Sequence, residues 1–300
     1  MKRIVSVSLG SSVRDHRVET EFFGEKVIIE RIGTNGDLNK AIALIKQLDG
    51  KVDAFGMGGI DLYLIAGSKR FVIRDAARMA KAARKSPMVD GSGLKNTLER
   101  QVVDFLQTKL KLQLRDKKVL MVSGVDRFGL AEGFVNAGCR MVFGDMIFAL
   151  GIPIPLTSLR SLRFLANMLL PIITKLPFTI LYPTGSKQEQ DTPKYAKYYE
   201  EADIIAGDFL YIKKYMPYGL KNKIIVTNTV TAADIEDLKA KGVSLLVTST
   251  PEFNGRSFGT NVMEALLVSF SKKDTQDLRD VDYLKLLQEM HFEPRVVKLA

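Results

Sequence analysis

Histidine, cysteine and tryptophan are almost missing from this chain of 300 residues, which contains two histidines, one cysteine and no tryptophan. With only His16 and His291, neither a histidine-based catalytic triad nor a multi-histidine metal site is expected, and we predict no metal. Cys139 cannot form an intrachain disulfide, which favours a reducing, cytoplasmic location. Proton transfer would then fall to lysine, aspartate, glutamate, tyrosine or a hydroxyl group.

Targeting and nucleic-acid-binding signals are also missing. The residues from Met1 to Ser8 run directly into a strand pattern without a small-residue cleavage site, so we expect no secretory signal. The net charge is +10, but the basic residues are dispersed and no helix-turn-helix or zinc-finger spacing occurs, so specific nucleic-acid binding is not expected. The charge instead favours anionic small molecules or an anionic membrane surface.

Strand and helix patterns alternate along the whole chain, which predicts an α/β protein with right-handed parallel crossovers. We expect two α/β domains, the second a Rossmann-like parallel sheet with flanking helices. Residues 1–105 would form an N-terminal α/β substrate domain and residues 106–262 a Rossmann-like nucleotide-binding domain. The helices of residues 263–300 would return to the first domain.

A strand, a glycine turn, a helix and a second strand ending in an acid occupy residues 117–145. Gly124 and Gly129 flank the turn into a helix whose N-terminal N–H groups could hold a pyrophosphate. Asp145 follows the second strand, where an acid accepts the ribose hydroxyls of a dinucleotide. This carboxylate favours NAD over NADP, because it would repel a 2′-phosphate.

The turn departs from the dinucleotide fingerprint at its centre. Asp126 stands where the motif has its middle glycine, and Arg127 and Phe128 follow it. The arginine could offset the repulsion between this acid and a phosphate. The alternative is an ordinary crossover that binds no ligand.

Hydroxyl and amide side chains follow other predicted strands of the second domain. Thr227 and Thr229 come after one strand, Thr248 ends another, and Asp208 follows a third. Ligands bind at the carboxyl edge of parallel α/β sheets, so these side chains could contact nicotinamide, ribose or substrate oxygens.

Asp90 and Lys95 are the candidate acid–base pair. Asp90 ends a strand at the expected interdomain cleft, Ser92 lies in the following glycine loop, and Lys95 begins the linking helix. A lysine held by an aspartate can accept a hydroxyl proton when burial lowers its pKa. The alternative is that Asp90 caps a turn and Lys95 is solvated.

Two further positions are candidates for substrate contacts. Asp61 follows a glycine run after a strand and could orient a hydroxyl, although the run could equally be a structural turn. Arg256 lies near the start of a predicted helix and could contact an anion.

Three stretches carry a resemblance to a known family: Val89–Leu98, Asp203–Asp208 and Thr248–Met263. Over essentially its whole length the chain resembles the shikimate and quinate dehydrogenase superfamily, and more closely a group of Firmicutes proteins labelled quinate 5-dehydrogenase. The resemblance implies NAD or NADP bound between two domains and a Lys–Asp pair acting on the hydroxyl being oxidised. It also implies a serine pair on the substrate carboxylate, which here would be Ser6 with Ser8, or Ser8 with Ser11.

The segment of residues 146–182 is long and apolar, but four prolines and several cations interrupt it, so it is a poor transmembrane helix. Two interpretations stay open. The segment could be buried against the sheet or a partner subunit, which implies a homo-oligomer, or it could be an interfacial helix in peripheral membrane contact.

Three functions remain at this point. The first is an NAD(P)-dependent oxidoreductase that acts on a polar, anionic alcohol or ketone as its small-molecule substrate. The second is a degenerate Rossmann protein that binds a nucleotide or partner without turnover. The third is a membrane-surface enzyme acting on a lipid-linked substrate.

Overall fold

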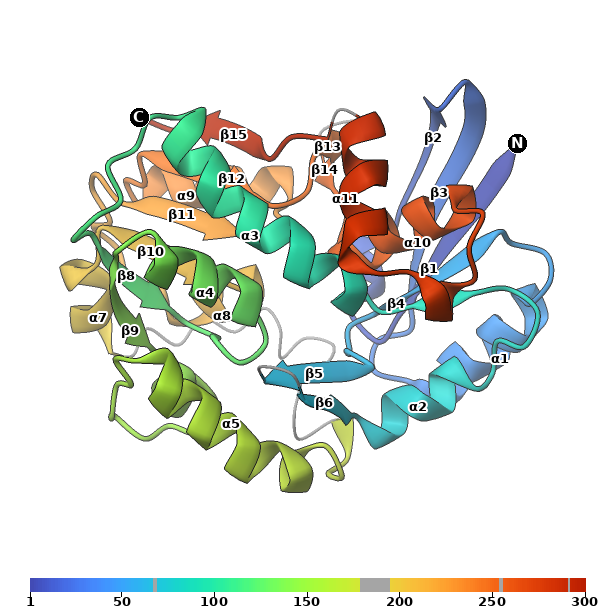
Figure 1. The fold of residues 1–300 in the computed structure, drawn as a ribbon, viewed down its shortest axis with the longest axis horizontal. Coiled ribbons are helices and arrows are strands. Elements are labelled where there is room, and N and C mark those ends of the chain that lie inside the picture. The colour runs from blue at the N-terminus through green and yellow to red at the C-terminus, as the bar shows by residue number, and fades with distance from the viewer. Residues whose placement is uncertain (67–68, 179–194, 254–255, 291) are drawn as a thin grey trace.

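The computed structural model describes residues 1–66, 69–178, 195–253, 256–290 and 292–300. The chain forms two α/β halves side by side, each built on its own sheet with helices on both faces (Figure 1). The predicted fold class is therefore confirmed.

The first half contains a five-stranded sheet in the order β2-β3-β1-β4-β7. Its strands are β1 (Lys2–Ser8), β2 (His16–Phe22), β3 (Glu25–Gly33), β4 (Ala54–Gly58) and β7 (Met88–Val89). The strands β3, β1, β4 and β7 are parallel, whereas β2 pairs with β3 as an antiparallel hairpin.

Alternation along β1 divides the apolar side chains between two layers. Val5 and Val7 pack against α1 (Leu38–Leu48) and α2 (Arg74–Ala80). Ile4 points to the other face, which packs against helices from the end of the chain. These helices are α10 (Thr260–Phe270) and α11 (Asp280–Glu289).

The second half contains a six-stranded sheet in the order β15-β12-β11-β10-β8-β9. Its strands are β8 (Lys118–Met121), β9 (Arg140–Phe143), β10 (Ile204–Gly207), β11 (Ile224–Thr227), β12 (Leu245–Thr248) and β15 (Arg295–Lys298). All are parallel except β15, which pairs with β12 in the antiparallel sense and adds an edge that the sequence pattern did not predict.

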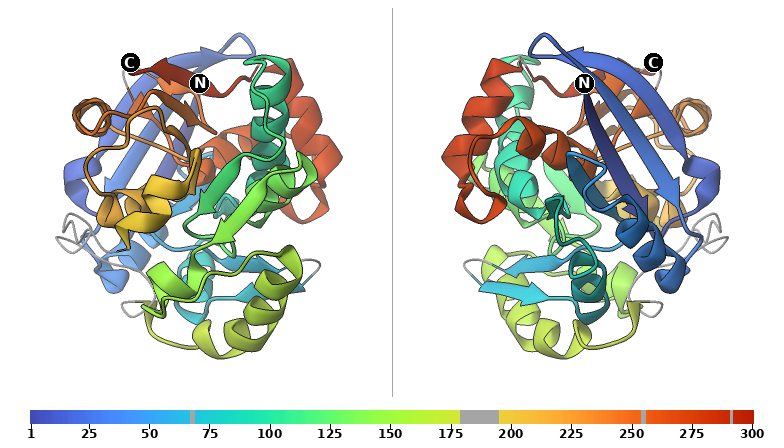
Figure 2. Two further views of the ribbon diagram at one scale, coloured as in Figure 1. Left: turned by 90° about the vertical axis from the view of Figure 1, so that its left-hand side faces the viewer. Right: turned by 90° about the vertical axis from the view of Figure 1, so that its right-hand side faces the viewer.

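The strands of this second sheet are apolar on both faces because helices cover both (Figure 2). Met121 packs with α3 (Ser92–Thr108) and α4 (Phe128–Asn136). Leu120 belongs to the opposite layer. That layer contains α7 (Ala196–Glu201), α8 (Phe209–Tyr215) and α9 (Ala232–Ala240).

The two sheets share one topology. Numbered by chain order within each half, the four leading parallel strands have the spatial order 2-1-3-4 in both. The chain passes between the halves three times, through α3, through the segment before α10, and through the segment before β15. The helices α10 and α11 thus lie in the first half, whereas the last strand lies in the second; the domain boundaries stay a prediction.

A smaller layer lies along one side of both halves (Figure 1). It contains α5 (Leu159–Ile173) and the hairpin of β5 (Tyr63–Ala66) with β6 (Lys69–Val72). The short elements are η1 (Ser12–Arg14), η2 (Asp145–Ala149), β13 (Glu252–Phe253), β14 (Arg256–Ser257) and η4 (Thr275–Asp277).

Some predicted features fall elsewhere. The sequence also predicts a strand over residues 178–182 and a helix near residues 193–201. Residues 179–182, the start of that helix and His291 lie outside the described residues. Among the helices that are described, none combines the length and apolarity needed to cross a membrane.

Candidate functional site

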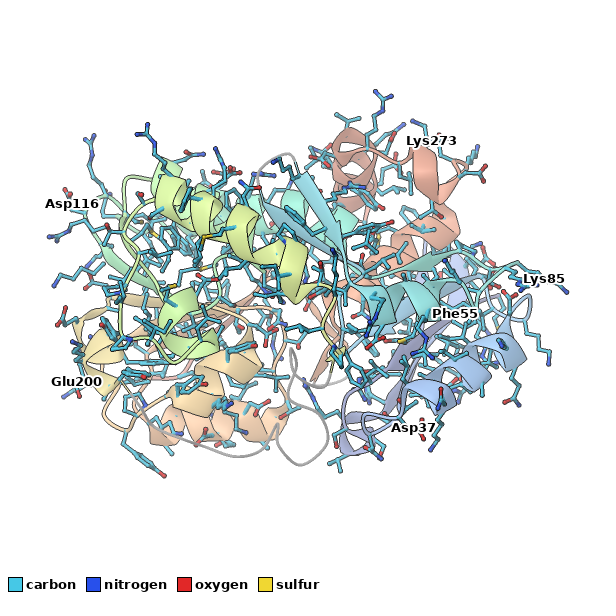
Figure 3. All side chains as sticks on the ribbon, turned by 90° about the horizontal axis from the view of Figure 1, so that it is seen from below. Asp37, Phe55, Lys85, Asp116, Glu200 and Lys273 are labelled. Carbon is cyan, nitrogen blue, oxygen red and sulfur yellow. The ribbon has the colours of Figure 1, made fainter. Side chains whose placement is uncertain are left out.

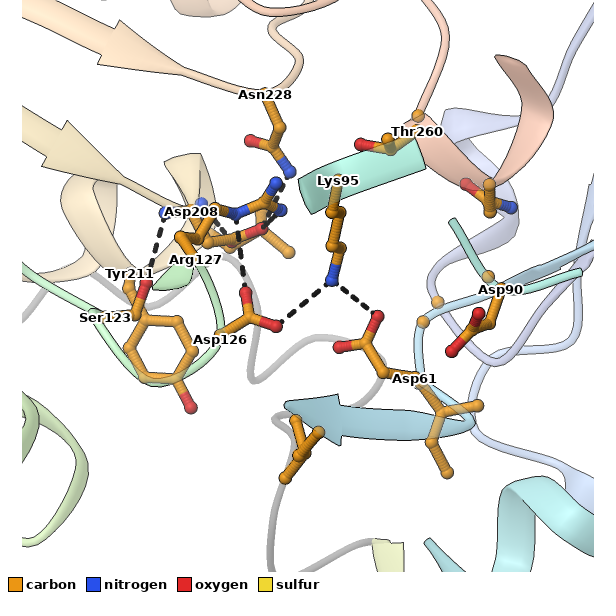
Figure 4. A pocket seen from close by; sticks show the side chains of 18 of the residues that line it. Asp61, Asp90, Lys95, Ser123, Asp126, Arg127, Asp208, Tyr211, Asn228 and Thr260 are labelled. Carbon is orange, nitrogen blue, oxygen red and sulfur yellow. Dashed lines mark hydrogen bonds and ion pairs between the residues drawn. The ribbon is translucent and has the colours of Figure 1, made fainter. Parts of the chain in front are cut away.

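A cavity of about 480 Å³ lies between the two halves (Figure 4). Its volume falls in the range of about 300–1,000 Å³ that is typical of small-molecule sites. The residues that line it come from both sheets and from α5.

The cavity opens where parallel strands of both sheets end. From the first half, Ser8, Gly58 and Asp90 line it, at or just after β1, β4 and β7. From the second half, Asp208 and Asn228 follow β10 and β11 in the same way. The carboxyl edges of two sheets with the same strand order therefore face one cavity, the position at which open α/β sheets bind ligands.

Lys95 lies at the polar end of the cavity, between one carboxylate from each half. Its Nζ donates to Asp61 Oδ1 at 2.7 Å and to Asp126 Oδ1 at 3.1 Å (Figure 4). The lysine side chain is 12% exposed, and those of Asp61 and Asp126 are 14% and 25% exposed. These charged groups are thus largely withdrawn from water but still line the cavity.

The proximity of these groups changes their acidity in opposite directions. Burial raises the pKa of Asp61 to about 7, against the opposing effect of Lys95. Burial also acts to raise the pKa of Asp126, but Lys95 and Arg127 outweigh it and lower the pKa. Burial disfavours the ammonium of Lys95, but Asp126 and Asp61 outweigh this effect and raise its pKa. At neutral pH, Lys95 and Asp126 are charged, whereas the equilibrium of Asp61 is shifted toward its protonated form.

Arg127 connects this group to the rest of the second half. Its guanidinium, 4% exposed, forms a buried ion pair with Glu99 of α3 and approaches Asp126 at 3.4 Å and Asp208 at 3.2 Å. The amide of Asn228 donates to Asp208 Oδ2 at 2.7 Å. Burial raises the pKa of Glu99, which the charge of Arg127 opposes. The polar end is therefore one connected network held by α3, α4 and two strand ends.

The predicted Asp90–Lys95 pair is not formed, because the two residues have other partners. Asp90 accepts backbone N–H bonds from Leu62 at 2.6 Å, Tyr63 at 3.0 Å and Ser92 at 3.0 Å. It therefore fixes a turn, as the alternative interpretation held, while Lys95 is paired with Asp61 and Asp126. Both residues still line the cavity, and their acid–base roles stay a prediction.

Asp145 occupies the glycine turn that was expected to hold a pyrophosphate. Its carboxylate accepts from the backbone N–H of Gly124 at 3.0 Å and of Val125 at 2.9 Å. A Cβ added at Gly124 would lie 2.9 Å from Leu162 of α5, so this glycine packs closely against that helix. The N–H groups and the acid that would bind a dinucleotide are thus bonded to each other.

The remaining predicted cofactor contacts are mostly directed into the protein. Phe128 packs in the core of the second half, and Gly129 lies in the first turn of α4. Thr227 donates to the carbonyl of Gly207 at 2.8 Å, and Thr248 donates to that of Thr250 at 2.7 Å. Thr229 does line the cavity.

Some of the predicted substrate contacts line the cavity, and others have structural roles or lie outside the described part of the structure. Ser8 lines the cavity and accepts from Arg31 at 2.9 Å, whereas the side chain of Ser11 caps η1. Asp61 lines the cavity, and the backbone N–H of Ser92 bonds to Asp90. Arg256 lies in β14, and its side chain is outside the described part of the structure.

Several site residues were missed by sequence reasoning. Glu99 looks like any helix residue, and Asp126 was treated only as a defect in the glycine motif. Asn228 stood between two threonines that were considered. Tyr211, Arg31 and Asn261 line the cavity without a local sequence signal.

In the part of the chain that the structure describes, no group of three or more potential metal ligands is found.

Two family models match the chain. One, described as "Domain of unknown function (DUF8754)", matches residues 93–299, and the other, described as "Domain of unknown function (DUF8753)", matches residues 3–90. The chain belongs to the DUF8754 family. No curated protein matches it.

Solved structures with similar architecture include two sugar-binding proteins and an oxidoreductase. A glucose-galactose binding protein from Geobacillus stearothermophilus is 10% identical, with 99% of this chain and 97% of that chain covered and a TM-score of 0.39. A carbohydrate transporter solute binding protein from Agrobacterium radiobacter, in complex with D-arabinose, is 12% identical, with 99% and 94% covered and a TM-score of 0.39. An NAD-dependent malic enzyme from Thermotoga maritima is 12% identical, with 96% and 84% covered and a TM-score of 0.35.

The expected relationship and activity are therefore corrected. The models that match the chain are DUF8754 and DUF8753, neither of which is described as a shikimate or quinate dehydrogenase family, so the predicted family is wrong. The predicted NAD(P)-dependent oxidoreductase and its NAD or NADP cofactor are wrong as well. The physical reason is the closed turn, in which Asp145 satisfies the N–H groups that a pyrophosphate would need.

Proposed function

We propose that this DUF8754 protein binds a small, uncharged molecule rich in hydroxyl groups in the cavity between its two halves. The observation that carries this proposal is the position of Lys95, which faces the cavity between a carboxylate of the first half and one of the second. A ligand at this point would contact both halves at once.

The polar end offers donors and acceptors at close spacing. Asp61 and Asp126 supply carboxylate oxygens, and Lys95 and Asn228 supply N–H groups. A hydroxyl both donates and accepts, so vicinal hydroxyls can be bonded by such a mixed set. Hydrogen bonds to charged groups are shorter and stronger than neutral ones, and one polyol can form several of them at once.

The charge balance favours an uncharged ligand. The cavity is lined by five aspartates against four arginine or lysine side chains, and Asp61 has a pKa of about 7. An anionic ligand would add negative charge next to the carboxylates. A strongly charged ligand of either sign would disrupt the ion pairs that are already formed. An unpaired charge is costly away from water.

The opposite wall is apolar and comes from α5. Leu165, Leu169 and Ile173 line it, and Leu176 follows them beyond the helix. This wall would pack against the carbon skeleton of the ligand or a short apolar substituent. The preferred ligand therefore has a hydroxyl-rich face and an apolar face.

Calorimetric titration of the full-length protein tests this function. The panel should contain neutral monosaccharides, cyclic polyols and short-chain alkyl glycosides, with sugar phosphates and NADH as charged comparators. We expect saturable binding of a neutral member and none of the charged comparators. Saturable binding confined to the charged compounds would overturn the proposal.

Variants then locate the binding site. Asn228→Ala and Asp126→Asn should weaken binding roughly tenfold or more, because each removes a hydrogen bond in a partly buried charged network. The matched control is Asp104→Asn, which changes an exposed carboxylate on the outer side of α3. Equal affinity in all three variants would show that the ligand binds elsewhere.

A further inference from the structure

The outer side of α5 is an apolar surface that the proposed binding function does not use. Phe164, Met168 and Ile172, spaced four residues apart, are 70%, 53% and 65% exposed. This spacing aligns them along one face of the helix. The opposite side of α5 is buried or lines the cavity, so the helix is apolar on both sides.

Basic side chains accompany this stripe. Arg160 lies at the N-terminal end of α5 and Lys175 just beyond its C-terminal end, both on the exposed side, and neither has an ion-pair partner among the described residues. Arg163 also lies on this helix, but it contacts Glu132 at 3.5 Å. The sequence contains no aspartate or glutamate from residue 146 to residue 178.

The basic surface continues onto α2. The backbone N–H of Arg74 donates to the carbonyl of Thr174 at 3.1 Å, which joins the start of α2 to the end of α5. The side chains of Arg74 and Arg78 are 60% and 55% exposed, and each is 3.7 Å from Asp75. Figure 3 views the molecule from the side on which α5, the β5–β6 hairpin and α2 lie.

We infer that the exposed face of α5 docks on an anionic lipid surface. A stripe of large apolar side chains with cations at both ends is the arrangement by which a helix lies in the interface of a membrane, with apolar groups among the acyl chains and cations at the headgroups. A helix of this length would lie along the surface for roughly 22 Å at about 1.5 Å per residue.

The charge of this face favours an anionic lipid surface over a second copy of the chain. A two-fold contact through the stripe would bring Arg160 and Lys175 of one copy toward the same two cations of the other, and the segment contains no acid to pair with them. An anionic lipid surface supplies both the apolar medium and the negative charge.

Vesicle co-sedimentation of the full-length protein tests the inference. We expect binding to vesicles of phosphatidylcholine with phosphatidylglycerol, less binding to phosphatidylcholine alone, and release at high salt, because salt screens surface charge. No binding to phosphatidylglycerol vesicles at low salt would overturn it.

Two sets of variants test the surface itself. Replacing Phe164, Met168 and Ile172 by serine should abolish vesicle binding, whereas serine at the equally exposed Val13, Tyr218 and Val281 should not. Arg160→Gln and Lys175→Gln should each weaken partition roughly fivefold, and Lys285→Gln, at a 78% exposed side chain, should leave it unchanged. Equal losses in the control variants would overturn the assignment.

Other occupants give different results. A dimer detected by analytical ultracentrifugation that dissociates in the triple serine variant, without vesicle binding, would show that a second copy covers the face. Binding to soluble polyglutamate that equals vesicle binding and survives the triple substitution would show a purely cationic patch. Either result would overturn lipid docking.

Discussion

The helix α3 carries one buried carboxylate and lies against another, and the protein stabilises the two in different ways. In the middle of the helix, Glu99 is paired with the buried guanidinium of Arg127. At its first turn, Gly93 lies against Glu264 of α10, which accepts from the Tyr283 hydroxyl at 2.7 Å and has no ion-pair partner among the described residues. One carboxylate is stabilised by a cation, and the other by holding a proton.

Burial raises the pKa of both carboxylates, but the charge of Arg127 opposes the rise at Glu99. Burial raises the pKa of Glu264 to about 8, with Asp90 adding to the effect. At neutral pH Glu264 is therefore mostly uncharged. The comparison shows that burial keeps an acid without a cation neutral even though a hydrogen bond from Tyr283 favours its charged form, whereas an acid within a charge network depends on its cation.

The largest expected effect comes from removing that cation. Arg127→Met should lower the free energy of unfolding by about 3–5 kcal/mol, because Glu99 would be left buried without a counter-ion. Denaturant unfolding measures the loss. The control is Lys109→Ala at the exposed end of the same helix, where Lys109 and Glu293 are 65% and 62% exposed and the pair is worth at most about 1 kcal/mol. Similar costs for both variants would contradict the comparison.

A smaller effect is expected at the first turn of α3. Gly93→Ala should destabilise the protein by about 1–3 kcal/mol, because the new Cβ would press against Glu264 and lie 2.8 Å from the Tyr283 hydroxyl oxygen. In a helix without this contact, alanine would instead stabilise by up to about 1 kcal/mol. The sign of the change in the thermal unfolding temperature therefore shows whether this contact destabilises the variant. Tyr283→Phe should relieve part of the cost in a double-variant cycle.

The smallest effect at neutral pH concerns Glu264 itself. Because its folded-state pKa lies above the ordinary value of 4.5, the fold keeps a proton that the unfolded chain releases. Its contribution to stability is therefore full below about pH 4.5 and is lost as the pH rises toward 8. Glu264→Gln, which cannot ionise, should unfold at a temperature that declines less between pH 6 and pH 9 than that of the wild type. Parallel pH profiles would show that Glu264 does not hold the proton.

The sequence predicted the fold well because its signals are local. The strand pattern within Met1–Ser8 predicted β1, and the strand, glycine turn, helix and strand of residues 117–145 predicted β8, α4 and β9. The antiparallel strand β15 was missed because its pairing with β12 joins segments about fifty residues apart, and no local pattern encodes that contact.

The site was predicted less well, for a related reason. Lys95, Asp61 and Asp90 were singled out, but their pairing was not, since Lys95 is 34 residues from Asp61 and 31 from Asp126. The glycine turn was misread because its spacing suits a dinucleotide whether or not the N–H groups are available. Only the three-dimensional structure shows that Asp145 has already satisfied them.

The return of α10 and α11 to the first half has a consequence for synthesis on the ribosome. The first sheet is complete at Val89, but the helices that cover one of its faces begin at Thr260. At a synthesis rate of about 5–20 residues per second, that face stays uncovered for roughly ten to thirty seconds before α10 emerges. During this interval apolar residues such as Ile4 and Ile29 are open to chaperones and to other nascent chains.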